Sequence, residues 1–311
     1  MNRFVEVRGK KMEVCIMGNG SQTVVIQTGI GCSFYDWFQI AEKLSSNYTV
    51  VLFHRPGYGK SELGNEPRTT LQATKELHEL LHILAIRQPI ILVGHSYGGL
   101  CAQQFAMLHS NQLKAVILVD STSMNLHRLD DLDLPVSDKT DSDDMWLQKY
   151  RSYSNMDSDS LYAELQSILA NQYSHLSSRK QKQYVDFSTS PLLYKATTSE
   201  LSEWKNCAKR MKQLEVTLKT PLVIIGRDPN YSIGEMIQGG MPNEEATKLE
   251  EVWQELIQEQ LMLSQNSRYI LAQNASHGIE SERPDIIIHA IHSLQEDDIH
   301  NVKNSENPRA K

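Results

Sequence analysis

The chain has 311 residues, with 31 Lys and Arg against 38 Asp and Glu, and a formal net charge of −7 at pH 7. No dense patch of Lys and Arg is present, which argues against a nucleic-acid partner. No apolar run approaches the roughly 20 residues that a membrane-spanning helix needs. The first residues lack the apolar core of a signal peptide. We therefore expect a soluble, cytoplasmic protein of one large domain, and nothing in the sequence indicates its oligomeric state.

The first 121 residues alternate between apolar runs and helical patterns. The apolar runs are continuous rather than alternating, which is typical of strands buried on both faces of a parallel sheet. In such sheets, sites form beyond the carboxyl ends of the strands. A hairpin is expected over 4–16, strands over 23–27, 48–53, 90–93 and 115–119, and helices over 37–44, from 69 or 70 to 84, and after residue 97.

Residues 122–218 have a different character and lack strong strand patterns. We interpret them as an inserted helical cap. Their acidic stretch, 129–144, lacks the ligand spacing and the glycine of a calcium loop, so a solvated loop is favoured over a metal site. The sheet resumes at 221–225 and 268–272, with helices over 243–263 and 284–294. The core is therefore assigned to residues 1–121 and 219–294, and the polar tail, 295–311, is expected to be disordered.

The stretch P-I-I-L-V-G-H-S-Y-G-G, residues 89–99, combines a strand, a tight turn and a helix around G-x-S-x-G. This is the context of a nucleophile elbow, in which Ser96 adopts a strained conformation while Gly94 and Gly98 avoid collisions with neighbouring backbone. The N–H of Tyr97 would lie at a helix N-terminus, free to bind an oxyanion. The alternative is an ordinary serine in a glycine-rich turn, and the strand-to-helix setting disfavours it.

A nucleophilic serine needs a base within reach, and the base needs an acid that orients it. Among eleven histidines, His277 stands out because it follows the last expected strand. Two carboxylates also follow strands, Asp120 before the insertion and Asp228 after it. We favour Asp228, because its R-D-P turn would direct the carboxylate towards His277, and keep Asp120 as the alternative acid. Either could instead be a turn or helix-cap residue.

Three further residues are candidates for substrate contact: Gly29 and Cys32 in one loop that faces the expected site, and His54 in another. The four cysteines have no metal-type spacing and are most simply buried thiols. We expect no metal and no organic cofactor.

Taken together, these segments resemble the α/β-hydrolase superfamily. The resemblance covers residues 4–294 except for the insertion, and implies that the second oxyanion donor is the backbone N–H of Ile30. Two residues depart from the family pattern: Thr28 stands where His is usual, and His54 where Asp is commoner. The matching segments are T-G-I-G-C-S-F-Y-D-W (28–37), H-R-P-G-Y-G-K-S (54–61), G-H-S-Y-G-G (94–99), L-V-D-S (118–121), G-R-D (226–228) and A-S-H-G (275–278).

The resemblance implies a serine hydrolase that cleaves a small-molecule carboxylic ester, or an amide or thioester, through an acyl-enzyme. A serine at position 96 argues against the dehalogenases and epoxide hydrolases of this fold, which use Asp there. Two alternatives stay open: hydrolysis of a carbon–carbon bond by the same residues, and a ligand sensor that turns over slowly. A non-catalytic interaction protein is disfavoured, because Ser96, His277 and both candidate acids are present.

Overall fold

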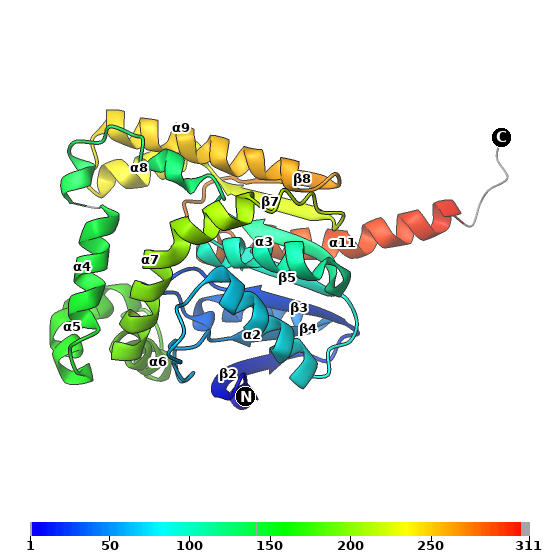
Figure 1. Cartoon of the computed structure of the whole chain (residues 1–311), viewed down its shortest axis with the longest axis horizontal. Coiled ribbons are helices and arrows are strands. Elements are labelled where there is room, and N and C mark those ends of the chain that lie inside the picture. Colours follow the sequence, from blue (N-terminus) through cyan, green and yellow to red (C-terminus); the bar gives the residue numbers. More distant parts are fainter. Residues whose placement is uncertain (1, 141, 306–311) are drawn as a thin grey trace.

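A computed structural model describes residues 2–140 and 142–305. Its centre is an eight-stranded sheet with the strand order β1-β2-β4-β3-β5-β6-β7-β8 (Figure 1). β1 pairs with β2, and β2 with β4, in the antiparallel sense, whereas every other neighbouring pair is parallel. The expected α/β fold with a mostly parallel sheet is thus confirmed. The strands are β1 (Asn2–Val7), β2 (Lys10–Met17), β3 (Gln22–Gln27), β4 (Tyr48–Phe53), β5 (Ile90–His95), β6 (Leu113–Val119), β7 (Leu222–Arg227) and β8 (Ser267–Ala272).

Helices cover both faces of the sheet because both faces of its parallel strands are apolar. On one face, Val24 and Ile26 of β3 belong to a buried cluster with residues of α1 (Phe38–Leu44) and α11 (Pro284–Ser305). On the other face, Val25 joins a cluster formed with α2 (Thr70–Ile83), α3 (Tyr97–His109) and α9 (Asn243–Glu259). Each fully buried aliphatic side chain contributes about 1.5–3 kcal/mol, so these two layers supply most of the stability.

The segment between β6 and β7 is helical, as expected, and contributes no strand to the sheet. Figure 1 shows α4, α5 and α6 gathered beyond one end of the sheet, with α7 running from them towards it. Their apolar cluster includes Leu161, Leu165 and Phe187 and takes in one core residue, Tyr58. The elements are η3 (Leu126–Leu129), η4 (Ser137–Lys139), α4 (Asp143–Tyr153), α5 (Ser158–Tyr173), α6 (Ser178–Ser188) and α7 (Pro191–Lys212).

Two elements near the C-terminus differ from expectation. α8 (Pro229–Gln238) was not foreseen, and α11 continues to Ser305, where disorder was expected from residue 295. Residues 306–311 lie outside the described part of the chain. Within that part, no helix is long and apolar enough to cross a membrane. The remaining short elements are η1 (Phe34–Trp37), η2 (Ser110–Gln112), η5 (Gln260–Leu263) and α10 (Ile279–Glu282).

The turn between β5 and α3 brings three backbone segments into close contact. A Cβ placed on Gly98 would lie 2.4 Å from the carbonyl oxygens of Gln27 and Thr28, and one on Gly94 would lie 2.5 Å from the carbonyl oxygen of Gly98. Backbone atoms cannot move aside as a flexible side chain can. The absence of a side chain at both positions therefore sets how closely α3 approaches β3 and β5.

We predict that Gly98→Ala lowers the free energy of unfolding by about 2 kcal/mol or more, because overpacking against backbone forces the sheet and helix apart. Chemical denaturation measures this change. Gly234→Ala is the matched control: Gly234 lies inside α8 and a Cβ there would meet nothing within 4 Å. The control should be neutral or stabilising by up to about 1 kcal/mol. Equal unfolding midpoints for the two variants would contradict the prediction.

Candidate active site

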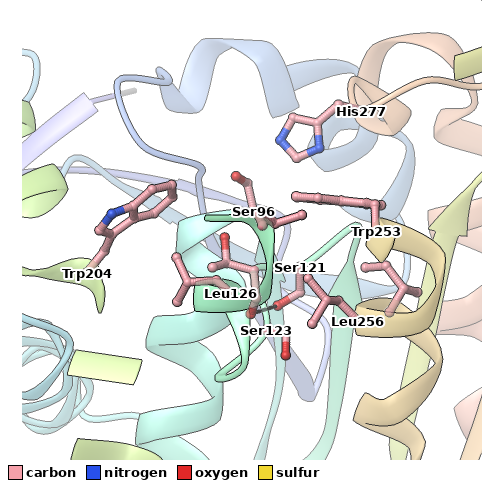
Figure 2. A pocket seen from close by; sticks show the side chains of 11 residues that line it. Ser96, Ser121, Ser123, Leu126, Trp204, Trp253, Leu256 and His277 are labelled. Carbon is pink, nitrogen blue, oxygen red and sulfur yellow. Dashed lines mark hydrogen bonds between the residues drawn. The ribbon is translucent and has the colours of Figure 1, made fainter. Parts of the chain in front are cut away.

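A cavity of about 240 Å³ lies beside the turn between β5 and α3, and we call it the serine pocket (Figure 2). Its lining combines hydroxyl groups and the imidazole of His277 with apolar and aromatic side chains. The serine pocket therefore has polar groups next to apolar space that suits an uncharged part of a ligand. Its lining consists of Ser96, Ser121, Thr122, Ser123, Leu126, Leu129, Trp204, Trp253, Leu256, Ile257 and His277.

The conformation of Ser96 is fixed from both sides. Its backbone has φ 52° and ψ −126°, the strained geometry expected of the turn. Its N–H donates to the carbonyl of Val119 (3.2 Å), and its carbonyl accepts from the N–H of Thr122 (3.1 Å) and of Gly99 (2.9 Å). These bonds tie the turn to the end of β6, so that the Ser96 side chain lies at the pocket (Figure 2).

His277 lies in the loop after β8, and its Nδ1 is 2.6 Å from Oδ2 of Asp120. Nδ1–H donates to this carboxylate, which leaves Nε2 as the proton acceptor. The carbonyl of His277 accepts from Nε2 of His95 (2.9 Å), so the buried His95 has a structural role. The Trp253 ring packs edge-on against His277, with centroids 5.7 Å apart.

Asp120 is fully buried at the end of β6. Its Oδ1 accepts from Nε1 of Trp253 (3.0 Å), and Oδ2 lies 3.6 Å from the guanidinium of Arg227. Burial alone would raise the pKa of Asp120, but the charge of Arg227, the contacts with His277 and the Trp253 hydrogen bond outweigh it and hold this pKa below its usual value. The carboxylate therefore stays ionised beside the imidazole.

The contact expected of Asp228 is made by Asp120 instead. Asp228 is the N-cap of α8: its Oδ1 accepts from the N–H groups of Asn230 (3.0 Å) and Tyr231 (3.3 Å), and its Oδ2 accepts from the N–H of Asn274 (3.0 Å). The preference for Asp228 is therefore corrected in favour of the alternative. The R-D-P turn begins a helix, with Asp at the cap and Pro at the first helical position, and this signal could be read from the sequence.

The two expected oxyanion donors are the backbone N–H groups of Ile30 and Tyr97. Nearby N–H groups are already used: Gly31 donates to the Tyr58 hydroxyl (2.8 Å) and Cys32 to the carbonyl of Gly29 (3.4 Å). Within residues 2–140 and 142–305, the N–H groups of Ile30 and Tyr97 meet no acceptor. They are thus free to donate to a bound group.

A buried arginine holds the loop that contains Ile30. The Arg55 guanidinium donates to the carbonyls of Thr28 (2.6 Å) and Gly29 (3.0 Å). It also forms two hydrogen bonds with the carboxylate of Glu200 in α7 (2.8 and 3.1 Å). The Tyr58 hydroxyl donates to the same carboxylate (2.5 Å). One buried ion pair therefore joins the inserted helices to residues 28–31.

The candidate substrate contacts have different surroundings. His54 is 1% exposed and lies outside the serine pocket: Nδ1 donates to Glu13 (2.8 Å) and Nε2 accepts from the N–H of Phe34 (3.3 Å). Burial, opposed by Glu13, lowers its pKa, so it is a neutral structural residue. A Cβ on Gly29 would lie 3.3 Å from both the Ser96 Cβ and the Cys32 sulfur, and Cys32 lines a second cavity.

Three residues that the sequence did not identify support this geometry: Arg227 and Trp253 around Asp120, and Glu200 beside Arg55. Arg227 belongs to a matching segment, G-R-D, but that segment does not indicate that Arg227 pairs with Asp120. Trp253 lies in α9, and only the tertiary structure gives its indole N–H an acceptor, Asp120. In the part of the chain that the structure describes, no group of three or more His, Cys, Asp or Glu residues is arranged to hold a metal ion.

A family model described as alpha/beta hydrolase fold matches residues 22–223, from β3 into β7. The chain belongs to the α/β-hydrolase family. Pimeloyl-[acyl-carrier protein] methyl ester esterase of Proteus mirabilis is 34% identical over 106 residues, which are 34% of this chain and 39% of the esterase. The match spans less than half the length of this and the other first curated relatives.

Solved structures of other α/β-hydrolases share the fold along nearly the whole chain. Epoxide hydrolase CorEH has a TM-score of 0.68 and 15% identity, covering 94% of this chain and 98% of its own. The enol-lactonase from Burkholderia xenovorans LB400 has a TM-score of 0.63 and 16% identity, covering 94% and 100%. At these identities the likeness shows the fold alone.

We predict that Asp120→Asn slows the labelling of Ser96 by a fluorophosphonate by about 10³-fold or more, because Asn cannot hold the Nδ1–H tautomer of His277. Asp228→Asn should leave the labelling rate within a few-fold. It should lower the free energy of unfolding by about 1 kcal/mol, because Asn keeps the helix cap but its amide nitrogen cannot accept the hydrogen bond from the Asn274 N–H. Mass spectrometry over a time course measures both rates. A slower labelling rate for Asp228→Asn than for Asp120→Asn would identify Asp228 as the acid.

We also predict that Glu200→Gln lowers the free energy of unfolding by about 3 kcal/mol, because it leaves the buried Arg55 guanidinium without a counter-charge. Glu203→Gln is the control on the same helix, since Glu203 contacts the exposed Arg210 at 3.4 Å and such pairs contribute at most about 1 kcal/mol. Urea denaturation compares the two variants. A similar, small decrease in the free energy of unfolding for both variants would mean that the Arg55–Glu200 ion pair does not hold α7 on the core.

Proposed function

We propose that this α/β-hydrolase cleaves a small-molecule carboxylic ester, or an amide or thioester, with Ser96 as nucleophile, His277 as base and Asp120 as the acid that orients it. The observation that carries the proposal is the 2.6 Å contact between His277 and the buried Asp120 in the pocket that Ser96 lines. A serine, an imidazole and a buried carboxylate in this relation are the parts of acyl-transfer catalysis.

In the proposed reaction, Asp120 keeps the Nδ1–H of His277 in place and Nε2 accepts the proton of the Ser96 hydroxyl. The serine oxygen attacks the carbonyl carbon, and the N–H groups of Ile30 and Tyr97 stabilise the oxyanion. His277 then returns the proton to the leaving group as the acyl-enzyme forms. Water, deprotonated by His277, attacks the acyl-enzyme, which releases the acid and restores the serine.

The ester class is supported by the residue at the turn. A serine there suits attack on a carbonyl carbon, whereas the epoxide hydrolases of this fold use a carboxylate. The Proteus mirabilis relative is named as a methyl ester esterase, which agrees with an ester substrate for this chain. The same geometry serves an amide or a thioester, because the attacked carbon and the oxyanion are alike.

The inserted helices supply much of the pocket wall opposite Ser96. Trp204 comes from α7 and Leu126 and Leu129 from η3. We infer that residues 122–218 act as a cap over the core, 1–121 and 219–294, and that the serine pocket takes the apolar acyl part of the substrate. A cavity of about 240 Å³ limits that part to a short chain or a single ring.

We predict that Ser96→Ala reduces the hydrolysis of short-chain p-nitrophenyl esters by about 10³-fold or more, since no nucleophile is left. A fluorophosphonate should form its adduct on Ser96, and His277→Ala should abolish that adduct. Ser110→Ala, at the far end of α3, should leave both readouts unchanged. Undiminished hydrolysis by Ser96→Ala would overturn the proposal. Rapid formation of one equivalent of p-nitrophenol per protein, followed by very slow hydrolysis of the acyl-enzyme, would favour the ligand sensor.

A further inference from the structure

A second cavity, of about 720 Å³, borders the loop that contains Ile30, and we call it the tyrosine pocket. Gly31 and Cys32 of that loop line it, as does Glu280 of α10. From the inserted helices, Tyr173 of α5 and Tyr184 of α6 line it too. The pocket is therefore lined by residues of both the core and the inserted helices.

Two carboxyl groups face this pocket. Glu280 is 9% exposed, and its Oε2 is buried without a hydrogen-bond partner among the described residues. The nearest basic group, Nε2 of His95, is 3.7 Å away and already donates to the carbonyl of His277. Burial lowers the pKa of His95, so this ring is neutral. The Glu280 carboxylate thus has no cation beside it.

The second carboxyl group is that of Asp36. Burial, opposed by a hydrogen bond from Tyr184 and reinforced by the charge of Glu280, raises the pKa of Asp36 to about 7. A cation bound in the pocket would favour the ionised form of Asp36 and would compensate the charge of Glu280. The basic residues that line the pocket, Lys180 and His175, are exposed to solvent, where water screens their charge.

Aromatic side chains also line the pocket. Tyr173 and Tyr184 stack with ring centroids 4.2 Å apart, and Tyr35 meets Tyr184 edge-on at 5.9 Å. Phe38 and Phe187 also line the pocket. Aromatic faces attract ammonium groups, most strongly where the site is desolvated. Aromatic rings and a buried carboxylate together select a cation rather than an anion or a neutral polar group.

We propose that the tyrosine pocket is a subsite for an ammonium-bearing part of the substrate. The proposal rests on the proposed function: the apolar acyl group occupies the serine pocket and the alcohol, or other leaving group, carries the cation. Gly29 lies beside both Cys32, which lines the tyrosine pocket, and Ser96, since a Cβ there would lie 3.3 Å from the Cys32 sulfur and from the Ser96 Cβ. Hydrolysis breaks the acyl C–O bond, and water supplies OH to the acid and H to the alcohol.

The test compares two esters that differ only in a quaternary nitrogen or carbon: butyrylcholine and 3,3-dimethylbutyl butyrate. The wild-type protein should have at least a tenfold higher kcat/KM for butyrylcholine, and Glu280→Gln should reduce this ratio to near one. Asp186→Asn, an exposed acid on α6 whose carboxylate contacts Lys182, is the charge control and should keep the preference. Equal or faster hydrolysis of the neutral ester by the wild type would overturn the subsite and leave the proposed function standing.

Binding of tetramethylammonium to Ser96→Ala, followed by calorimetry, tests the subsite without turnover. We expect binding that weakens at least tenfold when Glu280→Gln is added, even if neither butyrate ester is hydrolysed. No binding of tetramethylammonium would overturn the subsite. By contrast, a wild-type protein that forms no fluorophosphonate adduct on Ser96 would overturn the proposed function. The two failures are therefore distinguishable.

Discussion

The close approach of α3 to β3 and β5 is the constraint on which the rest of this structure depends. Gly98 packs against the carbonyls of Gln27 and Thr28, and the left-handed conformation of Ser96 lets the chain reverse at that point. Because Ser96 is also bonded to the backbone at the end of β6, the turn, the loop after β3 and Asp120 converge at one edge of the sheet. The side chains of the site are thereby brought together by backbone packing.

A buried carboxylate is costly unless its charge is compensated. Around Asp120 the compensation comes from three elements: Arg227 ends β7, Trp253 lies in α9, and His277 follows β8. The pKa of Asp120 is lower in the folded protein than in the unfolded chain. Asp120 therefore adds its full stabilisation at a pH above its unfolded-state pKa, and this stabilisation is lost as the pH falls through its folded-state pKa. The imidazole is thus oriented by a group that the fold itself needs in its charged form.

Much of the architecture could be predicted because it depends on local pattern. The apolar strands, the turn at Ser96 and the position of His277 after the last strand all follow from short stretches of sequence. The choice between Asp120 and Asp228 could not be made in the same way, since both follow strands and only tertiary contacts distinguish a buried partner from a helix cap. The pairings of His54 with Glu13 and of Arg55 with Glu200 span 41 and 145 residues, and no local signal marks them.

The Arg55–Glu200 pair links the inserted helices to the chemistry of the proposed site. Glu200 is in α7, which also carries Trp204 of the serine pocket, while Arg55 holds the carbonyls of the two residues that precede Ile30. A shift of α7 would therefore move a pocket wall and loosen the loop together. Tyr184 and Phe187, which line the tyrosine pocket, precede α7 directly in the chain. In the proposed mechanism, a ligand that holds these helices against the core would also hold the Ile30 N–H where the oxyanion forms.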